Sequence, residues 1–340
     1  MVLKMIYDAK FFDQVFERRG HDATKWDNPL FVKDNKDIVP MWVADMDFRT
    51  PDCIVDAMAK RLEHHAFGYF KIPQAYFDGI AKWQKERYGV DGVTADQVDY
   101  QNGVLGGVSS FVEAYSLPGD WILLNDTCYT GFQSTIANRG RNIVYSPVKE
   151  TADGWALDIE DMEKKIIEKK PPVMIFCNPH NPVGRVWTED EVRNIVELCK
   201  KYSVWLFSDE IHGDVVLYGH QYTSAARFAD VYDHMLVYTA ISKTFNMAGL
   251  HSSCTIIPNP EYKKIQEDTL RQAWLMSPNC MANSAIEACY TYGDEWVDEQ
   301  NAYLTENAEF VTSYLKEHAP SITSPILCTE LEDNQKIRLL

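Results

Sequence analysis

The sequence lacks the features that mark several large classes of protein. No apolar run approaches membrane-spanning length, and the N-terminus, interrupted by Lys4, Asp8 and Lys10, has no apolar signal-peptide core. Its 33 basic residues face 50 acidic ones, and the net charge of −17 creates a field that repels nucleic acid and anionic membranes. Internal repeats and low-complexity tracts are also absent. We therefore expect a cytoplasmic protein with small-molecule partners.

Cysteine is present but not in the arrangement that binds metals. None of the eight cysteines forms a C-x-x-C pair, and several lie inside apolar runs, as Cys177 does in 173–177. This pattern favours buried free thiols in a reducing compartment over a disulfide framework or a zinc site. We predict no structural metal.

Short apolar runs alternate with amphipathic stretches, and this alternation predicts an α/β fold with a mostly parallel sheet flanked by helices. The predicted strands are 97–100, 121–124, 142–145, 172–177, 204–207 and 235–238. A capping box at 188–191 predicts the start of a further helix. Other helices are predicted from Thr50-Pro51 to about His65, at 74–88, and from Asn279 to His318.

The length and the pattern together indicate an arm and two domains. A chain of 340 residues with 46% apolar content can bury a large core. We expect an N-terminal arm at residues 1–47, a large α/β domain at 48–286, and the helical start of a smaller C-terminal domain at 287–340.

Three polar segments follow predicted strands, and each carries a group suited to holding pyridoxal phosphate. Lys243, in Ser-Lys-Thr-Phe-Asn-Met-Ala-Gly-Leu at 242–250, has an amine that can form an imine. Asp209, in Ser-Asp-Glu-Ile-His, can keep a pyridine nitrogen protonated, and Asn181, in Asn-Pro-His-Asn-Pro-Val-Gly, can donate to a phenolic oxygen. Ligands of open α/β sheets gather at the carboxyl ends of the strands, so these groups should meet there.

Further segments complete the predicted site. The glycine-rich run 103–107 begins a helix whose free backbone N–H groups form an anion site, and Ser242 can donate to a phosphate oxygen. Tyr129 can stack on a ring, and His212 can add a contact beside it. Singly, each feature is also explained by a turn, a surface acid or a core aromatic. Their common position after predicted strands favours the site.

The chain resembles the fold-type I pyridoxal-phosphate enzymes of the class I/II aminotransferase superfamily. It is most similar to the MalY/PatB-type cystathionine β-lyases, also called C–S lyases. The shared strings are Trp-Val-Ala-Asp-Met-Asp-Phe at 42–48, Phe-Gly-Tyr at 67–69, Asn-Pro-His-Asn-Pro-Val-Gly at 178–184, Val-Trp-Thr at 186–188, Ser-Asp-Glu-Ile-His at 208–212 and the run 242–250. The similarity extends from about residue 6 to about residue 320.

The resemblance implies a role for each residue near the cofactor ring. Lys243 would carry the Schiff base and act as the catalytic residue. Asp209 would face the pyridinium nitrogen, and Asn181 would face the phenolic oxygen. Tyr129 would stack on the ring, with His212 near it.

It also implies how the phosphate is held. Ser242 and the backbone of Val104 and Leu105 would bind it, and Tyr69 would reach the phosphate of the neighbouring subunit in a homodimer. Many transaminases bind this phosphate with an arginine eight residues after the lysine, a position that His251 occupies here.

The implied reaction is β-elimination of cysteine S-conjugates such as L-cystathionine, which gives a thiol, pyruvate and ammonia. An aminotransferase is an alternative, because it shares every step up to loss of the α-proton. A non-catalytic cofactor-binding or regulatory protein is another. The resemblance ends near Ser324, and the late arginine that grips the substrate carboxylate in the family has no clear match in 324–340. The small domain is accordingly expected to be incomplete, truncated or divergent after about 324.

Overall fold

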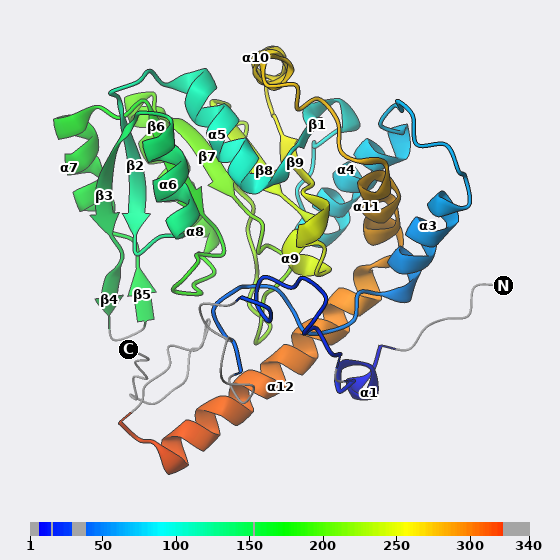
Figure 1. Cartoon of the computed structure of the whole chain (residues 1–340). Helices are drawn as coiled ribbons and strands as arrows, with labels where there is room; N and C mark the ends of the chain where they lie inside the picture. Colours follow the sequence, from blue (N-terminus) through cyan, green and yellow to red (C-terminus); the bar gives the residue numbers. More distant parts are fainter. Residues whose placement is uncertain (1–6, 15, 29–38, 152–153, 322–340) are drawn as a thin grey trace.

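The chain folds around a seven-stranded sheet in a computed structural model that describes residues 7–14, 16–28, 39–151 and 154–321 (Figure 1). The strands, in sheet order, are β1 (Val98–Gln101), β9 (Ser253–Ile256), β8 (Met235–Thr239), β7 (Trp205–Asp209), β6 (Val173–Cys177), β2 (Trp121–Asp126) and β3 (Asn142–Pro147). The five strands from β8 to β3 pair in parallel, and β9 pairs antiparallel with both β8 and β1. The predicted α/β class and mostly parallel sheet are confirmed.

Helices cover both faces of this sheet (Figure 1). The α-helices of the described residues are α3 (Asp52–Leu62), α4 (Gln74–Tyr88), α5 (Gly103–Tyr115), α6 (Thr130–Asn138), α7 (Ile159–Lys169), α8 (Glu189–Tyr202), α10 (Pro260–Gln272), α11 (Cys280–Tyr292) and α12 (Asp294–His318), with the short helices α1 (Ala9–Phe12) and α9 (Ile241–Thr244). In β6, Val173 and Ile175 join the core that includes α5 and α6, whereas Met174 and Phe176 join the core that includes α7 and α8. Successive strand residues face opposite sides of the sheet, so the five buried residues of β6 require helices packed on both faces.

The predicted helix ends are confirmed at several places. The capping box forms as expected: the Thr188 hydroxyl accepts from the backbone N–H of Glu191, whose carboxylate accepts from the N–H of Thr188. The sequence places the start of α3 at Thr50-Pro51, and Pro51 is indeed its cap residue, although it makes no side-chain capping bond. The Thr50 hydroxyl takes no part in the cap and donates to the carbonyl of Phe245 at 3.2 Å.

Close packing of α5 on the sheet depends on one glycine. A Cβ placed on Gly107 would lie 2.6 Å from Cε1 of Tyr238 in β8, so only a residue without a side chain lets the helix approach this closely. The start of α5 is thereby held at the carboxyl edge of the sheet. The N-terminal arm and α9 lie on that same side (Figure 1).

Several elements had no counterpart among the predictions, among them β9, a hairpin of β4 (Lys149–Thr151) and β5 (Gly154–Ala156), and the helices α6, α7 and α10. The boundary expected near residue 286 falls within α11, which packs against α3 and α4, and the domain division stays a prediction. The tail after residue 324, with its expected truncation or divergence, lies outside the described residues. Within the described residues no helix is both long and apolar enough to cross a membrane, and the seven cysteines there are free thiols.

Candidate active site

Lys243 lies in the single turn of α9, directly after β8. Its Nζ donates a hydrogen bond to the backbone carbonyl of Ala44 at 2.5 Å. Burial lowers the pKa of the Lys243 amine, and the negative charges of Asp45 and Asp209 partly oppose this effect. A lowered pKa increases the share of neutral amine, which is the form that attacks a carbonyl.

Asp209 is the last residue of β7 and is almost completely buried. Burial, with a smaller contribution from the charge of Glu210, raises the pKa of its carboxyl group to about 7. The backbone N–H of Ile211, which donates to Oδ1 at 3.1 Å, and the charge of Lys243 act in the opposite direction. Within the described residues no side chain forms an ion pair with Asp209, so this buried carboxylate fits a site that receives a cationic nitrogen.

His212 lies on the loop after β7, close enough to Lys243 for the two charges to interact. Burial, and then the charge of Lys243, lower the pKa of His212 to about 4. The ring is therefore neutral at physiological pH. It can offer a hydrogen bond or a flat contact surface, but no charge.

The loops that carry Asn181 and Tyr129 lie beside each other. His180 Nε2 donates to the carbonyl of Thr127 at 2.7 Å, which joins the loop after β6 to the loop after β2. The N–H of Asn178 donates to the carbonyl of Asp209 at 2.9 Å, which joins the same loop to the end of β7. Asn181 is half-buried, and among the described residues its side-chain amide has no hydrogen-bond partner. An amide in this position is free to donate to a ligand.

The start of α5 has the form of an anion site. Asn102 precedes the helix and makes no side-chain capping bond, so it does not occupy the first backbone N–H groups. Leu105 lies near the Tyr129 ring: a Cβ on Gly131 would be 2.9 Å from Leu105 Cδ2 and 2.5 Å from Tyr129 Cε1. Gly131 thus lets the exposed ring of Tyr129 lie against the first turn of α5, which includes Val104.

The remaining predicted residues divide into two groups. Ser242 is buried directly before Lys243, and His251 is exposed and, like Lys243, lines a cavity that is described below. Tyr69 lies apart from them, fully exposed in the loop between α3 and α4. No contact between Tyr69 and the Lys243 site of the same chain is seen among the described residues.

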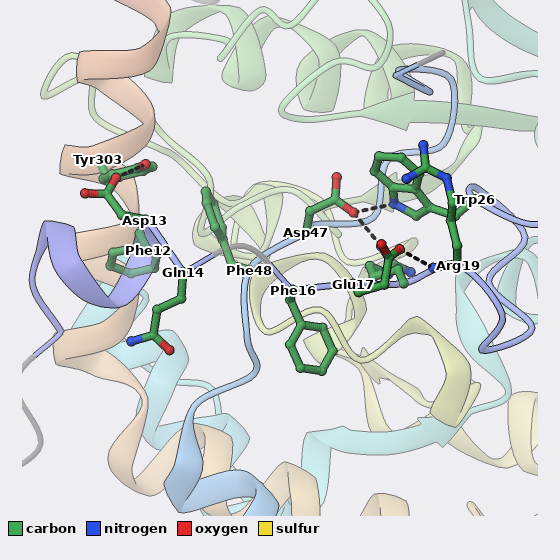
Figure 2. Close-up of a pocket in the computed structure, with 11 residues that line it drawn as sticks. Phe12, Asp13, Gln14, Phe16, Glu17, Arg19, Trp26, Asp47, Phe48 and Tyr303 are labelled. Carbon is green, nitrogen blue, oxygen red and sulfur yellow. Dashed lines mark hydrogen bonds and ion pairs between the residues drawn. The ribbon is translucent and has the colours of Figure 1, made fainter. Parts of the chain in front are cut away.

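The sequence did not predict an ionic cluster that borders Lys243. Arg18 forms a two-pronged ion pair with Asp45, at 2.8 and 3.0 Å, and contacts Asp47 at 3.0 Å. Lys25 Nζ lies 2.8 Å from Asp47. Trp26 Nε1 donates to the same carboxylate at 2.7 Å, as Figure 2 shows. Burial raises the pKa of Asp47, but the hydrogen bonds from Lys25, Trp26 and Arg18 outweigh it and hold the pKa below its ordinary value.

Asn246 binds the segment 44–48, which carries Asp45 and Asp47 of this ionic cluster. Its Oδ1 accepts from the N–H of Met46 at 3.1 Å, and its Nδ2 donates to the carbonyls of Met46 and Phe48 at 2.9 and 3.2 Å. Ala44, which accepts from Lys243, belongs to the same segment. In the sequence, the segments 42–48 and 242–250 both carry strings shared with the family, but the strings do not show that the two segments are in contact.

Two hollows adjoin this cluster. A cavity of about 560 Å³ opens beside Lys243 and is also lined by Arg18, Asp45 and His251. It has room for an amino-acid substrate. A smaller hollow of about 320 Å³ lies between the N-terminal arm and α12, where Tyr303 donates to Asp13 at 2.7 Å (Figure 2).

The chain belongs to the class I and II aminotransferase family, whose model matches residues 36–331. It is 36% identical to cystathionine beta-lyase PatB of Bacillus subtilis (strain 168), over 92% of this chain and 80% of that protein. It is 29% identical to protein MalY of Escherichia coli (strain K12), again over 92% and 80%. The crystal structure of cystalysin from Treponema denticola, which contains pyridoxal 5'-phosphate, superposes with a TM-score of 0.88 at 30% identity, over 93% and 80%. The family resemblance drawn from the sequence is confirmed.

Proposed function

We propose that this chain eliminates thiols from cysteine S-conjugates, with L-cystathionine as a representative substrate. The chain is an enzyme that depends on pyridoxal 5'-phosphate, as its family membership and the cofactor of its solved relative show. The presence of a cystathionine β-lyase among its relatives supports carbon–sulfur cleavage as the reaction. The balanced reaction takes L-cystathionine and water to homocysteine, pyruvate and ammonia.

The observation that carries the proposal is the pair Lys243 and Asp209. Buried Asp209 and half-buried Lys243 lie at the same edge of the sheet, each within range of the other's charge. When bound, the cofactor draws electrons from the α-carbon of the substrate. Lys243 Nζ would condense with the cofactor aldehyde with loss of water, and after the substrate amine displaced it, the freed neutral amine would take the α-proton. Asp209 keeps the ring nitrogen protonated, and this maintains the electron withdrawal.

The other predicted residues would hold the cofactor in place. The free amide of Asn181 would donate to the phenolic oxygen. Backbone N–H groups of Val104 and Leu105, with the Ser242 hydroxyl, would hold the phosphate. Tyr129 would cover the ring, a role supported by its exposed face and its place against the start of α5. His212 would contact the site as a neutral ring.

The active unit would be a homodimer in which Tyr69 reaches the neighbouring site. In one chain, Tyr69 is fully exposed, and Phe67 and Phe70 beside it also expose apolar surface. Two inactive variants, Tyr69→Ala and Lys243→Ala, test this when they are unfolded and refolded together. Mixed dimers that share sites should regain part of the activity. Dimers without any recovered activity would contradict the sharing of Tyr69.

The reaction itself is tested with L-cystathionine and no 2-oxo acid, by measuring pyruvate and free thiol. Equal amounts of both products are expected. Turnover that requires a 2-oxo acid would identify an aminotransferase instead, and a yellow but inert protein would identify a non-catalytic binder. The cytoplasmic location stays a prediction.

The lysine assignment is tested by reduction of the cofactor-loaded protein with borohydride and mass analysis of its peptides. The cofactor should be found on Lys243, and Lys243→Ala should be colourless and inactive. Lys264→Ala is a suitable control because Lys264 is exposed on α10, and its ion-pair partner among the described residues is Asp268 on the same helix. Labelling of a different lysine would overturn the assignment.

A further inference from the structure

Asp214 lies in the turn 211–214 that follows β7, and its side chain is 4% exposed. Its Oδ1 accepts hydrogen bonds from Trp83 Nε1 at 3.0 Å and from the Tyr88 hydroxyl at 2.6 Å. Arg87 Nε lies 3.2 Å from the same oxygen. These three partners all come from α4, so one carboxylate oxygen ties this turn to that helix.

The second oxygen of Asp214 contacts the helix that carries the lysine. Thr244 Oγ1, which is buried, donates to Oδ2 at 2.8 Å. Helix α9 has only four residues, and a helix of one turn is not stable by itself. Its orientation must therefore come from tertiary contacts, among which a hydrogen bond to a carboxylate is one of the stronger.

The hydrogen bond between Thr244 and Asp214 affects Lys243 because the two residues are neighbours in the chain. Thr244 directly follows Lys243, so a fixed Thr244 side chain limits rotation of the single turn about its axis. That rotation sets the direction in which Lys243 leaves the backbone. Lys243 is long and flexible, and a small error at its base moves Nζ away from its target.

We propose that Asp214 is a positioning residue that acts through Thr244 to aim Lys243 at the cofactor. The inference rests on the proposed role of Lys243. The segment 209–214 would then place both reacting groups, with Asp209 at its start facing the ring nitrogen and Asp214 at its end anchoring α9. The segment 209–214 would thus set the distance between Lys243 Nζ and the Asp209 carboxylate.

A buried carboxylate with several donors also stabilises the fold, so the test needs variants that separate the two roles. Thr244→Val removes the hydroxyl next to Lys243 and keeps the shape of the side chain. Tyr88→Phe removes a hydroxyl from the same carboxylate on the α4 side. Each deletes one donor to Asp214, and a purely structural carboxylate predicts similar effects from both. Thr244→Ser returns the hydroxyl.

The readout is the rate at which apoprotein forms the covalent bond between Lys243 and pyridoxal phosphate, followed by absorbance and verified by borohydride reduction. We expect Thr244→Val to slow this rate by about tenfold or more, because misplacement of a reacting group by about 1 Å can reduce rates by up to about a hundredfold. Tyr88→Phe should react at a rate close to wild type at similar loss of stability, measured by urea unfolding. Thr244→Ser should recover most of the rate.

Two results would overturn the role of Asp214: no slowing in Thr244→Val, or equal slowing in Thr244→Val and Tyr88→Phe. Neither result affects the proposed function. That function fails separately, if Lys243→Ala still captures the cofactor or if reduction labels another lysine.

Discussion

Replacement of Asp209 by asparagine should stabilise the cofactor-free protein at neutral and higher pH. The carboxyl group has an ordinary pKa of 3.8, and burial raises it to about 7. Between these values the folded protein keeps a proton that the unfolded chain has lost. The free energy of unfolding therefore falls as pH rises through this window and levels off above pH 7.

The size of the effect follows from the two pKa values. Their difference of about three, at ~1.4 kcal/mol for each pH unit, corresponds to about 4 kcal/mol by pH 8. Asparagine does not titrate and can still accept from the Ile211 N–H. The gain of Asp209→Asn over wild type should thus grow by about 4 kcal/mol between pH 4 and pH 8.

His212 has to be separated from this effect. Burial and the Lys243 charge lower the pKa of His212 to about 4, so the unfolded chain binds the extra proton between pH 4 and 6.5. Its contribution to stability rises with pH across a window that overlaps that of Asp209, with the opposite sign. Subtracting wild type from variant at each pH removes it.

Urea unfolding of both proteins at several pH values, followed by tryptophan fluorescence, measures the difference. Asp230→Asn is the matched control, because Asp230 is an exposed acid. A constant difference between Asp209→Asn and wild type from pH 4 to pH 8 would refute the reasoning. In saturating pyridoxal phosphate, the growth of the difference with pH should shrink, since a protonated ring nitrogen opposite Asp209 supplies the missing cation.

Two further variants test packing near the site by the same unfolding assay. Gly107→Ala places a methyl group 2.6 Å from Tyr238 and should destabilise the protein by about 1–3 kcal/mol, whereas Gly106→Ala, whose Cβ meets only Asn102 at 3.5 Å, should be neutral or stabilise by up to about 1 kcal/mol. Equal effects would show that α5 can shift away from β8. Asn246→Ala removes three hydrogen bonds to the segment 46–48 and should destabilise by about 2–4 kcal/mol. Asn246→Gly should be milder, because glycine accepts the φ of +58° at this position.

The strands and most helix ends could be predicted because their signals are local. A run such as 173–177 is apolar at every position, and the capping box at 188–191 needs only neighbouring residues. β9 gave no such signal, since Ser253 and Thr255 interrupt it. They are buried only because β9 lies between β1 and β8.

The candidate site residues could be proposed from the sequence for a related reason. Parallel strands end at a common edge, so positions directly after strands can be grouped without knowledge of the fold in detail. The contacts around them could not be found this way. Arg18 pairs with Asp45 across 27 positions, and Asp214 meets Thr244 across 30. No periodicity links such pairs, and only the folded chain brings them together.

The two central groups also explain why cofactor binding should couple to stability. Burial shifts the pKa of Lys243 downwards and that of Asp209 upwards, so each is held away from its preferred charge in the cofactor-free protein. Asp45 of the neighbouring ionic cluster, which is paired with Arg18, opposes the downward shift of the Lys243 pKa only in part. A ligand that takes up the neutral amine and brings a cationic nitrogen relieves both. Cofactor binding should therefore stabilise the fold beyond the new contacts it makes, and it should do so most where Asp209 is ionised.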